Sequence, residues 1–303
     1  VLRLGGKHLD MGDYDLMGVM TGSEGLLGIV SEVTLRILQK PATQRALLVG
    51  FDDTTAAATA VGDVIGAGII PAGMEMMDKA LIDATDKFSK AGYPKDAEVL
   101  MIVELDGTKS EVDGLLNKVS EIAKQNNSNS MKLSNNEKER LAFWSGRKAA
   151  FPACGAMAPD YYCMDGSIPR GKLSLILKEI NQLSKKYNLA VANAFHAGDG
   201  NLHPLLVFDA NEEGTLDRVH QVAAEIVKIS LEAGGVLSGE HGIGIEKQEF
   251  MSQLFTHSDL EHQNKLRTAF DPQCRINPGK VLPTGHSCAD IQTLNIIPEG
   301  TWV

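Results

Sequence analysis

The spacing of hydrophobic and polar positions changes period repeatedly between residues 41 and 233. Short apolar runs typical of strands alternate with longer segments whose apolar residues recur every three or four positions, as in amphipathic helices. A run of Asn, Ser and Gln at 125–130 separates two such units and predicts a polar loop. The expected strands are 46–51, 74–77, 98–105, 161–168, 190–195 and 202–208, and the expected helices are 54–66, 79–88, 109–125, 137–150, 172–187 and 216–233.

This repetition predicts an α+β fold in which two similar halves pack on one sheet, although no sequence repeat is evident. Upstream, residues 21–28 predict a glycine-rich loop, and 29–37 predict an alternating strand that ends near Pro41. Glycines let backbone N–H groups approach a ligand, but a plain hairpin of small residues has the same pattern. The chain opens on a strand-like piece without Met, so we expect it to be the C-terminal part of a longer protein.

Composition narrows the function classes. With 303 residues, 43% of them hydrophobic, the chain can bury a full core. The net charge of −10 and the lack of a Lys/Arg-rich run argue against nucleic acid or an anionic membrane as a direct partner. We see no signal peptide and no apolar stretch near the roughly 20 residues that cross a bilayer. The scattered Cys154, Cys163, Cys274 and Cys288 form no Cys-x-x-Cys pair, which disfavours an iron–sulfur cluster or structural zinc and predicts reduced thiols in a cytoplasmic setting.

Two glycine-rich segments carry the candidate chemistry. His196 and His203 flank a stretch with two glycines, which predicts a tight reversal that lets both rings face one point. Glu240 follows a Gly pair typical of a helix end. Two imidazoles and one carboxylate form a known set of three metal ligands that leaves a position open for water or substrate. Ordinary core or surface histidines remain the alternative for the first segment alone.

The residue after Glu240 completes the candidate chemistry. His241 is not needed as a ligand, so it is the candidate for proton transfer. A zinc hydrolase would use the same two histidines and glutamate, with His241 or a carboxylate activating water, and it would not need the glycine-rich loop at 21–28. These residues alone therefore leave the reaction class open.

Five motifs occur in the order and spacing of one protein family. They are Gly22-Ser23-Glu24-Gly25-x-x-Gly28-Ile29-Val30, Trp144-Ser145-Gly146-Arg147-Lys148-x-x-Phe151-Pro152, HAGDGNLHP at 196–204, SGEHGIG at 238–244, and Ile276-Asn277-Pro278-Gly279-Lys280. Together they resemble the FAD-linked 2-hydroxy-acid dehydrogenases of the vanillyl-alcohol oxidase type over residues 1–283. Residues 159–169 are most similar to the FAD-binding subunit of bacterial glycolate oxidases, with D-lactate and D-2-hydroxyglutarate dehydrogenases as cousins.

The resemblance implies a domain organisation and a cofactor. Residues 1–40 would be the C-terminal remnant of a PCMH-type FAD-binding domain, 41–282 a ferredoxin-like-duplicated substrate or cap domain, and 283–303 a tail. The family's N-terminal half would carry most of the FAD site, so this chain alone is not expected to hold FAD. The residues implied at the cofactor are Gly22, Ser23, Gly25, Gly28, Ile29 and Asn277; a turn Asn before Pro is the other interpretation of Asn277.

The resemblance also implies roles in catalysis. His196, His203 and Glu240 would hold a divalent metal, with zinc favoured over manganese or iron. His241 would be the general base, and Arg147 would bind the substrate carboxylate, although a solvated charge on a helix is the alternative for Arg147. Asp199 and Asn201 would order the histidines or touch substrate.

Substrate and partners follow from the same resemblance. Cys163 stands where D-2-hydroxyglutarate dehydrogenases have a basic residue, which favours glycolate or D-lactate as substrate. Electrons would pass to a quinone or to an iron–sulfur subunit and a second flavin subunit of a glycolate oxidase complex, with any membrane association indirect, at the inner face of the plasma membrane. A D-lactate or D-2-hydroxyglutarate dehydrogenase without an iron–sulfur partner, and a non-catalytic assembly subunit, are the alternatives.

Overall fold

The computed structural model describes residues 1–6 and 14–283. The chain divides into two compact units, Val1–Ile37 with His241–Val303 as unit 1 and Leu38–Glu240 as unit 2. This division falls between Glu240 and His241, whereas the sequence predicts a single domain over 41–282. The expected domain boundaries, at 40/41 and 282/283, therefore stay a prediction.

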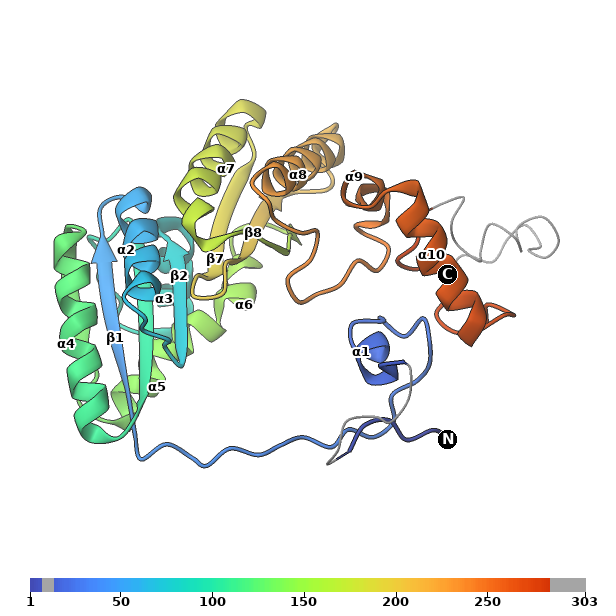
Figure 1. The fold of residues 1–303 in the computed structure, drawn as a ribbon. Coiled ribbons are helices and arrows are strands. Elements are labelled where there is room, and N and C mark those ends of the chain that lie inside the picture. Colours follow the sequence, from blue (N-terminus) through green and yellow to red (C-terminus); the bar gives the residue numbers. More distant parts are fainter. Residues whose placement is uncertain (7–13, 284–303) are drawn as a thin grey trace. The chain divides into compact units, whose positions relative to one another are not determined.

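Unit 2 is built on one eight-stranded sheet with the order β4-β1-β3-β2-β7-β8-β5, in which β6 pairs with β8 (Figure 1). All the pairings that the structure describes are antiparallel. The strands are β1 (Thr43–Phe51), β2 (Gly73–Asp78), β3 (Val99–Gly107), β4 (Ser128–Leu133), β5 (Asp160–Cys163), β6 (Gly166–Ser167), β7 (Ala190–His196) and β8 (Asn201–Phe208).

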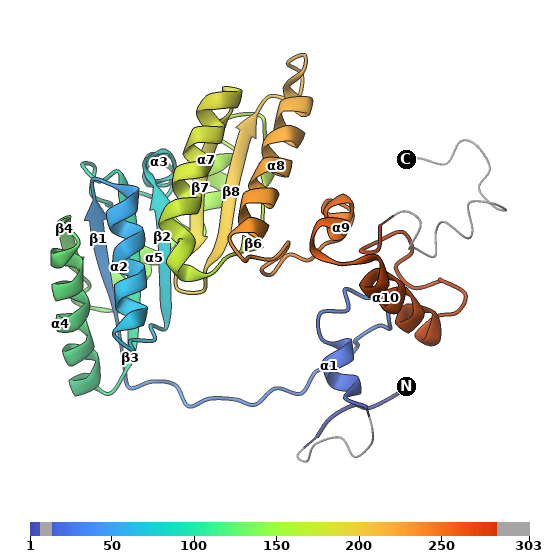
Figure 2. The same ribbon diagram turned by 45° about the horizontal axis from the view of Figure 1, so that its top comes forward.

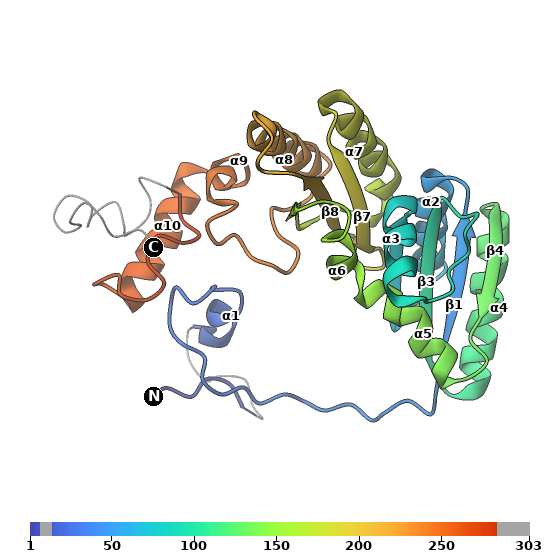
Figure 3. The ribbon, with the colours of Figure 1, turned by 180° about the vertical axis from the view of Figure 1, so that it is seen from behind.

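Helices cover both faces of this sheet. One face carries a row formed by α4 (Lys109–Gln125), α2 (Thr54–Gly66), α7 (Leu173–Tyr187) and α8 (Thr215–Glu232), as Figure 2 shows. On the other face lie α5 (Glu137–Lys148), α3 (Lys79–Ser89) and α6 (Ala150–Cys154), which are seen from behind in Figure 3. A short 3₁₀ turn, η1 (Arg170–Lys172), precedes α7. Side-chain N-caps start α2, α3, α4 and α5, each accepting a backbone hydrogen bond from the first turn.

The two halves of the sheet meet along a short seam between β2 and β7. Its register contains two pairs, Met76 opposite Phe195 and Met77 opposite Ala194. One hydrophobic cluster spans this seam on the α3/α5/α6 face, because Leu48 and Leu100 from the first half share it with Ala194 and Leu205 from the second. Burial of apolar side chains across the seam makes the halves one core.

The expected elements of unit 2 are confirmed with shifts of a few residues, and two expectations are wrong. Residues 128–130 belong to strand β4 rather than to a polar loop, because an edge strand needs only one partner and β4 pairs with β1, which lets polar residues such as Asn129 stay exposed. The strand expected over 161–168 is two short strands, β5 and β6, because the chain leaves the extended ladder at Met164 and Asp165. The helix expected over 137–150 is confirmed as α5, and the separate helix α6 follows after Ala149. The single sheet with two helical layers confirms the α+β prediction.

Unit 1 contains α1 (Leu16–Met20), the 3₁₀ turn η2 (Gln248–Phe250), α9 (Met251–Leu254) and α10 (His257–Phe270). The strand expected over 29–37 is absent there, because no described strand forms a ladder with it, and Ile29 and Ile37 are exposed. Of the described cysteines, Cys154 and Cys163 are thiols and Cys274 is disulfide-bonded, so the expectation of reduced thiols is wrong at Cys274. Among the described residues no helix has the length and apolarity to span a membrane. The tail after Pro283 lies outside the described residues.

Candidate functional site

The hairpin formed by β7 and β8 brings the two candidate histidines together. His196 ends β7, His203 lies opposite Ala194 on β8, and a turn at 197–200 joins the strands. Gly200 takes a left-handed φ of 74° in this turn, and a Cβ there would lie 2.3 Å from the Ile168 carbonyl oxygen. Only glycine fits this position. The predicted reversal is confirmed, and the ring centroids lie 5.2 Å apart with an interplanar angle of 87°.

Glu240 meets both imidazoles. Its Oε1 lies 3.0 Å from His203 Nε2 and 3.4 Å from His196 Nε2, and one nitrogen or oxygen of each residue lies within 4.8 Å of the others. Two ligands about 2.1 Å from one tetrahedral metal ion are separated by about 3.4 Å, so the donor atoms are already near ligand spacing. The donor set, two neutral imidazoles and a carboxylate, therefore fits a divalent metal such as zinc, manganese or iron.

Each imidazole is oriented through its other ring nitrogen. His196 Nδ1 lies 2.8 Å from Glu75 Oε1, and His203 Nδ1 lies 3.3 Å from the Met164 carbonyl oxygen. Both partners are acceptors, so with a metal bound Nδ1 would carry the proton in each ring and leave the Nε2 lone pair for the metal. The hydrogen bond from His196 to Glu75 raises the pKa of His196 above its ordinary value.

A buried carboxylate holds the segment that carries Glu240. Asp165 accepts hydrogen bonds from Ser238 Oγ (2.6 Å) and from the backbone N–H groups of Gly239 and Glu240. Gly239 itself must lack a side chain, because a Cβ there would lie 2.3 Å from Asn201 Oδ1. The chain is therefore fixed immediately before the candidate ligand.

Arg147 belongs to the same cluster and is not a solvated charge. Its side chain is 9% exposed and its Nε donates to Glu75 Oε2 at 3.0 Å. The end of α5 presents it to the sheet face that carries Glu75. One carboxylate thus bonds both the candidate carboxylate-binding arginine and a candidate metal ligand.

Three further residues named by the sequence lie around the histidines. Cys163, at the end of β5, has its Sγ within 4.8 Å of a His203 ring nitrogen. Asn201 is buried beside His203, with its Nδ2 3.5 Å from Nε2, which is too long for a strong hydrogen bond. Asp199 is an exposed turn residue whose backbone N–H donates to the His196 carbonyl. Cys163 and Asn201 therefore border the candidate metal site.

All six candidate cofactor residues gather in unit 1. Gly22, Ser23, Gly25, Gly28, Ile29 and Asn277 line one open groove of about 610 Å³, together with Met20, Glu24, Val30, Arg275 and Ile276. Gly22 and Gly25 both have a φ of 75°, and a Cβ at Gly22 would enter open space. The glycines and apolar side chains suit a flat ligand such as a portion of FAD, and Arg275 and Glu24 contribute one charge of each sign.

Glu24 ties this loop to two other motifs. Its carboxylate accepts from the N–H groups of Ile243 (2.8 Å) and Gly244 (2.9 Å), and its carbonyl accepts from Asn277 Nδ2 (2.7 Å). His241 opens the segment that precedes Ile243 and belongs to unit 1, whereas the metal triad belongs to unit 2. Its role as base rests on its place next to Glu240 in the chain and stays a prediction.

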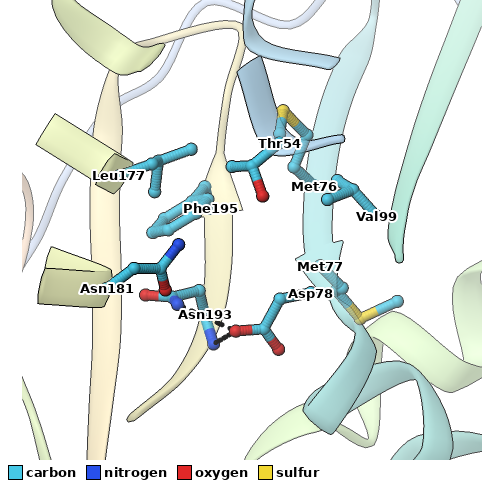
Figure 4. A pocket seen from close by; sticks show the side chains of 9 residues that line it. All are labelled: Thr54, Met76, Met77, Asp78, Val99, Leu177, Asn181, Asn193 and Phe195. Carbon is cyan, nitrogen blue, oxygen red and sulfur yellow. Dashed lines mark hydrogen bonds between the residues drawn. The ribbon is translucent and has the colours of Figure 1, made fainter. Parts of the chain in front are cut away.

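The other face of the sheet contains a small cavity of about 20 Å³ (Figure 4). Asp78 lies at its edge and accepts hydrogen bonds from the backbone and side-chain nitrogens of Asn193, both at 2.8 Å. Burial raises the pKa of Asp78 to about 6. The Asn193 Oδ1 is buried without a partner among the described residues, and the volume suits one water molecule. This cavity is separate from the candidate metal site.

A family model described as "FAD linked oxidases, C-terminal domain" matches residues 40–281. The chain belongs to this family. This FAD-linked oxidase chain is 47% identical over 295 residues to the glycolate oxidase subunit GlcD of Escherichia coli, and the match covers 97% of the chain and 59% of that protein. It is 28% identical over 271 residues to the probable mitochondrial D-lactate dehydrogenase of Danio rerio, covering 89% of the chain and 54% of that protein. The chain thus spans less than two thirds of the length of these relatives.

The solved structures agree on the fold. The structure of p-cresol methylhydroxylase with bound substrate matches the FAD-linked oxidase chain with a TM-score of 0.62 and 13% identity, covering 80% of the chain and 54% of that protein. At this identity the match supports the architecture alone. The family description names FAD as the cofactor.

Three acidic residues that organise these sites were not among the candidates from sequence. Glu75, Asp165 and Glu24 each bond to motif residues far away in the chain. Glu75 lies in a strand of mostly apolar residues, which is a visible signal of a buried charge with a partner. The partner itself could not be identified from the sequence.

Proposed function

We propose that this chain is the substrate-binding part of an FAD-dependent enzyme that oxidises a small 2-hydroxy acid, glycolate or D-lactate, to the 2-oxo acid. The cluster of His196, His203, Glu240 and Arg147 around Glu75 supports this proposal most directly. It combines a set of donors for a Lewis acid with a buried guanidinium, which suits a substrate that carries a hydroxyl group next to a carboxylate. The relatives named for glycolate and D-lactate act on this class of compound.

The division of labour follows from the residues. His196, His203 and Glu240 would hold the metal, which when bound lowers the pKa of the substrate hydroxyl. Arg147 binds the substrate carboxylate, and its planar fork fixes the orientation of the molecule. His241 accepts the hydroxyl proton, while the α-carbon gives up its hydride, a proton with two electrons, to the flavin of the holoenzyme. The products are the 2-oxo acid, protonated His241 and reduced flavin.

Arg147 has an edge suited to this task. Its Nε is used by Glu75, and its two terminal nitrogens donate no hydrogen bond to a residue within 1–6 or 14–283. The two terminal nitrogens of a guanidinium can bind both oxygens of one carboxylate. This supports substrate binding over a purely structural ion pair.

The substrate proposed is a small monocarboxylate. Cys163 borders His203, and a thiol offers no positive charge to a second carboxylate. Electrons would leave through partner subunits of a glycolate oxidase complex, an iron–sulfur subunit and a second flavin subunit, or through a quinone. A dehydrogenase that acts on D-lactate without an iron–sulfur partner is the alternative within the same chemistry. A zinc hydrolase is disfavoured by the family match.

The experiment is anaerobic reduction of the flavin-loaded holoenzyme that contains this chain. Glycolate and D-lactate are each added before and after a chelator removes bound metal, and flavin bleaching is followed at its visible absorbance. Bleaching that stops with the chelator and returns with zinc or manganese supports the proposal. His203→Ala should abolish the bleaching and its recovery with added metal, whereas His220→Ala, which replaces an exposed histidine on α8, should leave both unchanged. Bleaching that is unchanged by the chelator would show that the metal takes no part in the reaction.

A further inference from the structure

Glu75 is a buried carboxylate of unit 2 that the proposed reaction does not yet use. It lies in the middle of β2, is 7% exposed, and has apolar neighbours on both sides in the chain. Its two carboxylate oxygens have different partners, Oε1 with His196 Nδ1 at 2.8 Å and Oε2 with Arg147 Nε at 3.0 Å. A buried carboxylate is costly unless both oxygens are satisfied, and here both are.

The sheet brings these three residues together. Met76 pairs with Phe195 across the seam, so continuing this antiparallel register by one residue puts Glu75 opposite His196. Side chains of directly opposed residues lie on the same face of a sheet. This is the face on which α5 packs, because Gly73, two residues before Glu75, lies against Trp144 of α5. Arg147 follows one turn later on that helix.

We propose that Glu75 is a positioning residue that links the two halves of the substrate site. Its first oxygen orients the His196 ring so that Nε2 faces the metal position. Its second oxygen holds Arg147 through Nε and leaves both terminal nitrogens for the substrate carboxylate. A single side chain, Glu75, therefore fixes the distance between His196, the metal ligand, and Arg147, the carboxylate-binding group. This inference rests on the proposed function.

The amide variant Glu75→Gln keeps the shape but can no longer satisfy both partners. Its one carbonyl oxygen can accept a hydrogen bond from His196 or from Arg147, and its NH₂ group repels the other donor. Loss of a group that orients a metal-ligating histidine typically lowers metal affinity by about 10–100-fold. We expect Glu75→Gln to weaken zinc binding by this range and to raise the KM for glycolate or D-lactate at least as strongly as it lowers kcat.

Glu104 provides a matched control. It is also a buried glutamate on a central strand, β3, and it also bonds α5, through Arg140 Nη1 at 2.6 Å and Trp144 Nε1. Neither of these partners is a candidate ligand or substrate-binding residue. Glu104→Gln therefore loosens the same helix from the same sheet face without touching the site. Glu75→Asp is the second variant, because it retains the charge but is one methylene too short to reach both partners.

The experiment measures zinc affinity by calorimetry on the metal-free protein, and KM and kcat on the holoenzyme, for the wild type and the three variants. Thermal unfolding confirms that each variant folds. We expect at least 10-fold weaker zinc binding and a raised KM for Glu75→Gln and Glu75→Asp, with changes under about 3-fold for Glu104→Gln. Equal losses in Glu104→Gln, or wild-type zinc affinity in Glu75→Gln, would overturn the inference. A third outcome separates the two proposals. If the Glu75 variants bind zinc more weakly but no 2-hydroxy acid bleaches the flavin of the wild-type holoenzyme, the proposed function is wrong and the orientation of His196 by Glu75 is supported.

Discussion

Replacing Asp165 with Asn tests how the protein places Glu240. Asp165 is buried and accepts hydrogen bonds from Ser238 Oγ and from two consecutive backbone N–H groups, those of Gly239 and Glu240. Asn has the same size but replaces one acceptor oxygen by an NH₂ donor. That donor can be satisfied by the Ser238 hydroxyl, which also accepts, but both backbone N–H groups then share one uncharged oxygen, so the segment before the carboxylate ligand is held less firmly.

The magnitude follows from the bonds that are lost. A hydrogen bond to a charged group contributes about 1.5–3 kcal/mol, and Asn retains one oxygen that can still accept. We expect Asp165→Asn to lower the free energy of unfolding by about 2–3 kcal/mol. Because Glu240 moves with its own N–H group, zinc affinity should also fall by about 10–100-fold.

The assay is urea unfolding with and without zinc. A ligand at about 100 times its Kd stabilises a folded protein by about 2.7 kcal/mol, so a weaker site gives a smaller increment at the same zinc concentration. Ser238→Ala is the matched control, because it removes the Oγ donor but leaves both backbone bonds to Asp165. It should lower stability by about 1 kcal/mol and leave the zinc increment intact.

Full retention of the zinc increment in Asp165→Asn, despite the lost stability, would refute this role of the carboxylate. Asp165 would then stabilise the loop without placing Glu240. A loss of the increment in Ser238→Ala as well would show that the whole loop, rather than the backbone bonds, controls the site.

Three more outcomes are expected. Gly239→Ala should weaken zinc binding and destabilise the protein, because its Cβ would lie 2.3 Å from Asn201 Oδ1, and unchanged thermal unfolding and zinc titration would contradict this close contact. The pKa of Asp78 is raised from 3.8 to about 6, so the folded state binds this proton more tightly than the unfolded state. Protonation of Asp78 therefore adds up to about 3 kcal/mol to the free energy of unfolding. This contribution is full below pH 3.8 and is lost as the pH rises to about 6. Asp78→Asn should flatten this part of the stability profile in urea unfolding across that pH window, and an unchanged slope would exclude Asp78 as its source. Because Glu75 raises the pKa of His196, protons should compete with zinc, so calorimetric zinc affinity should fall as pH drops through and below neutrality; a pH-independent affinity would argue against His196 as a ligand.

Local pattern predicted the helices and strands of unit 2 because their periods of about 3.6 and 2 are set by which face is buried. The polar composition of residues 128–130 predicts a loop, yet an edge strand gains its hydrogen bonds from a neighbour, β1, that lies far away in the chain. The segment at 29–37 shows the reverse: its alternating pattern is typical of a strand, but pattern alone supplies no ladder partner.

The candidate ligands were predicted from their residue types and from the glycines that permit the turn between His196 and His203. The residues that orient them were not, because Glu75 and Asp165 are single carboxylates whose partners lie more than 70 positions away. Such pairs depend on the order of strands in the sheet, which periodicity does not encode. Arg147 shows the limit most clearly, since the same helix position suits an exposed charge until β2 places a glutamate beside it.

The short seam between β2 and β7 affects where the sheet of unit 2 opens locally. Only two residue pairs define its register, so the backbone amides there should open more readily than those of the nine-residue ladder between β1 and β3. Arg147 is bound to β2 through Glu75, whereas His196 and His203 belong to β7 and β8. A ligand that contacts all three residues would therefore hold the two sides of the seam together. Hydrogen–deuterium exchange of the amides that bridge β2 and β7 would then slow when ligand binds, and the protection would report occupancy of the site without following any reaction.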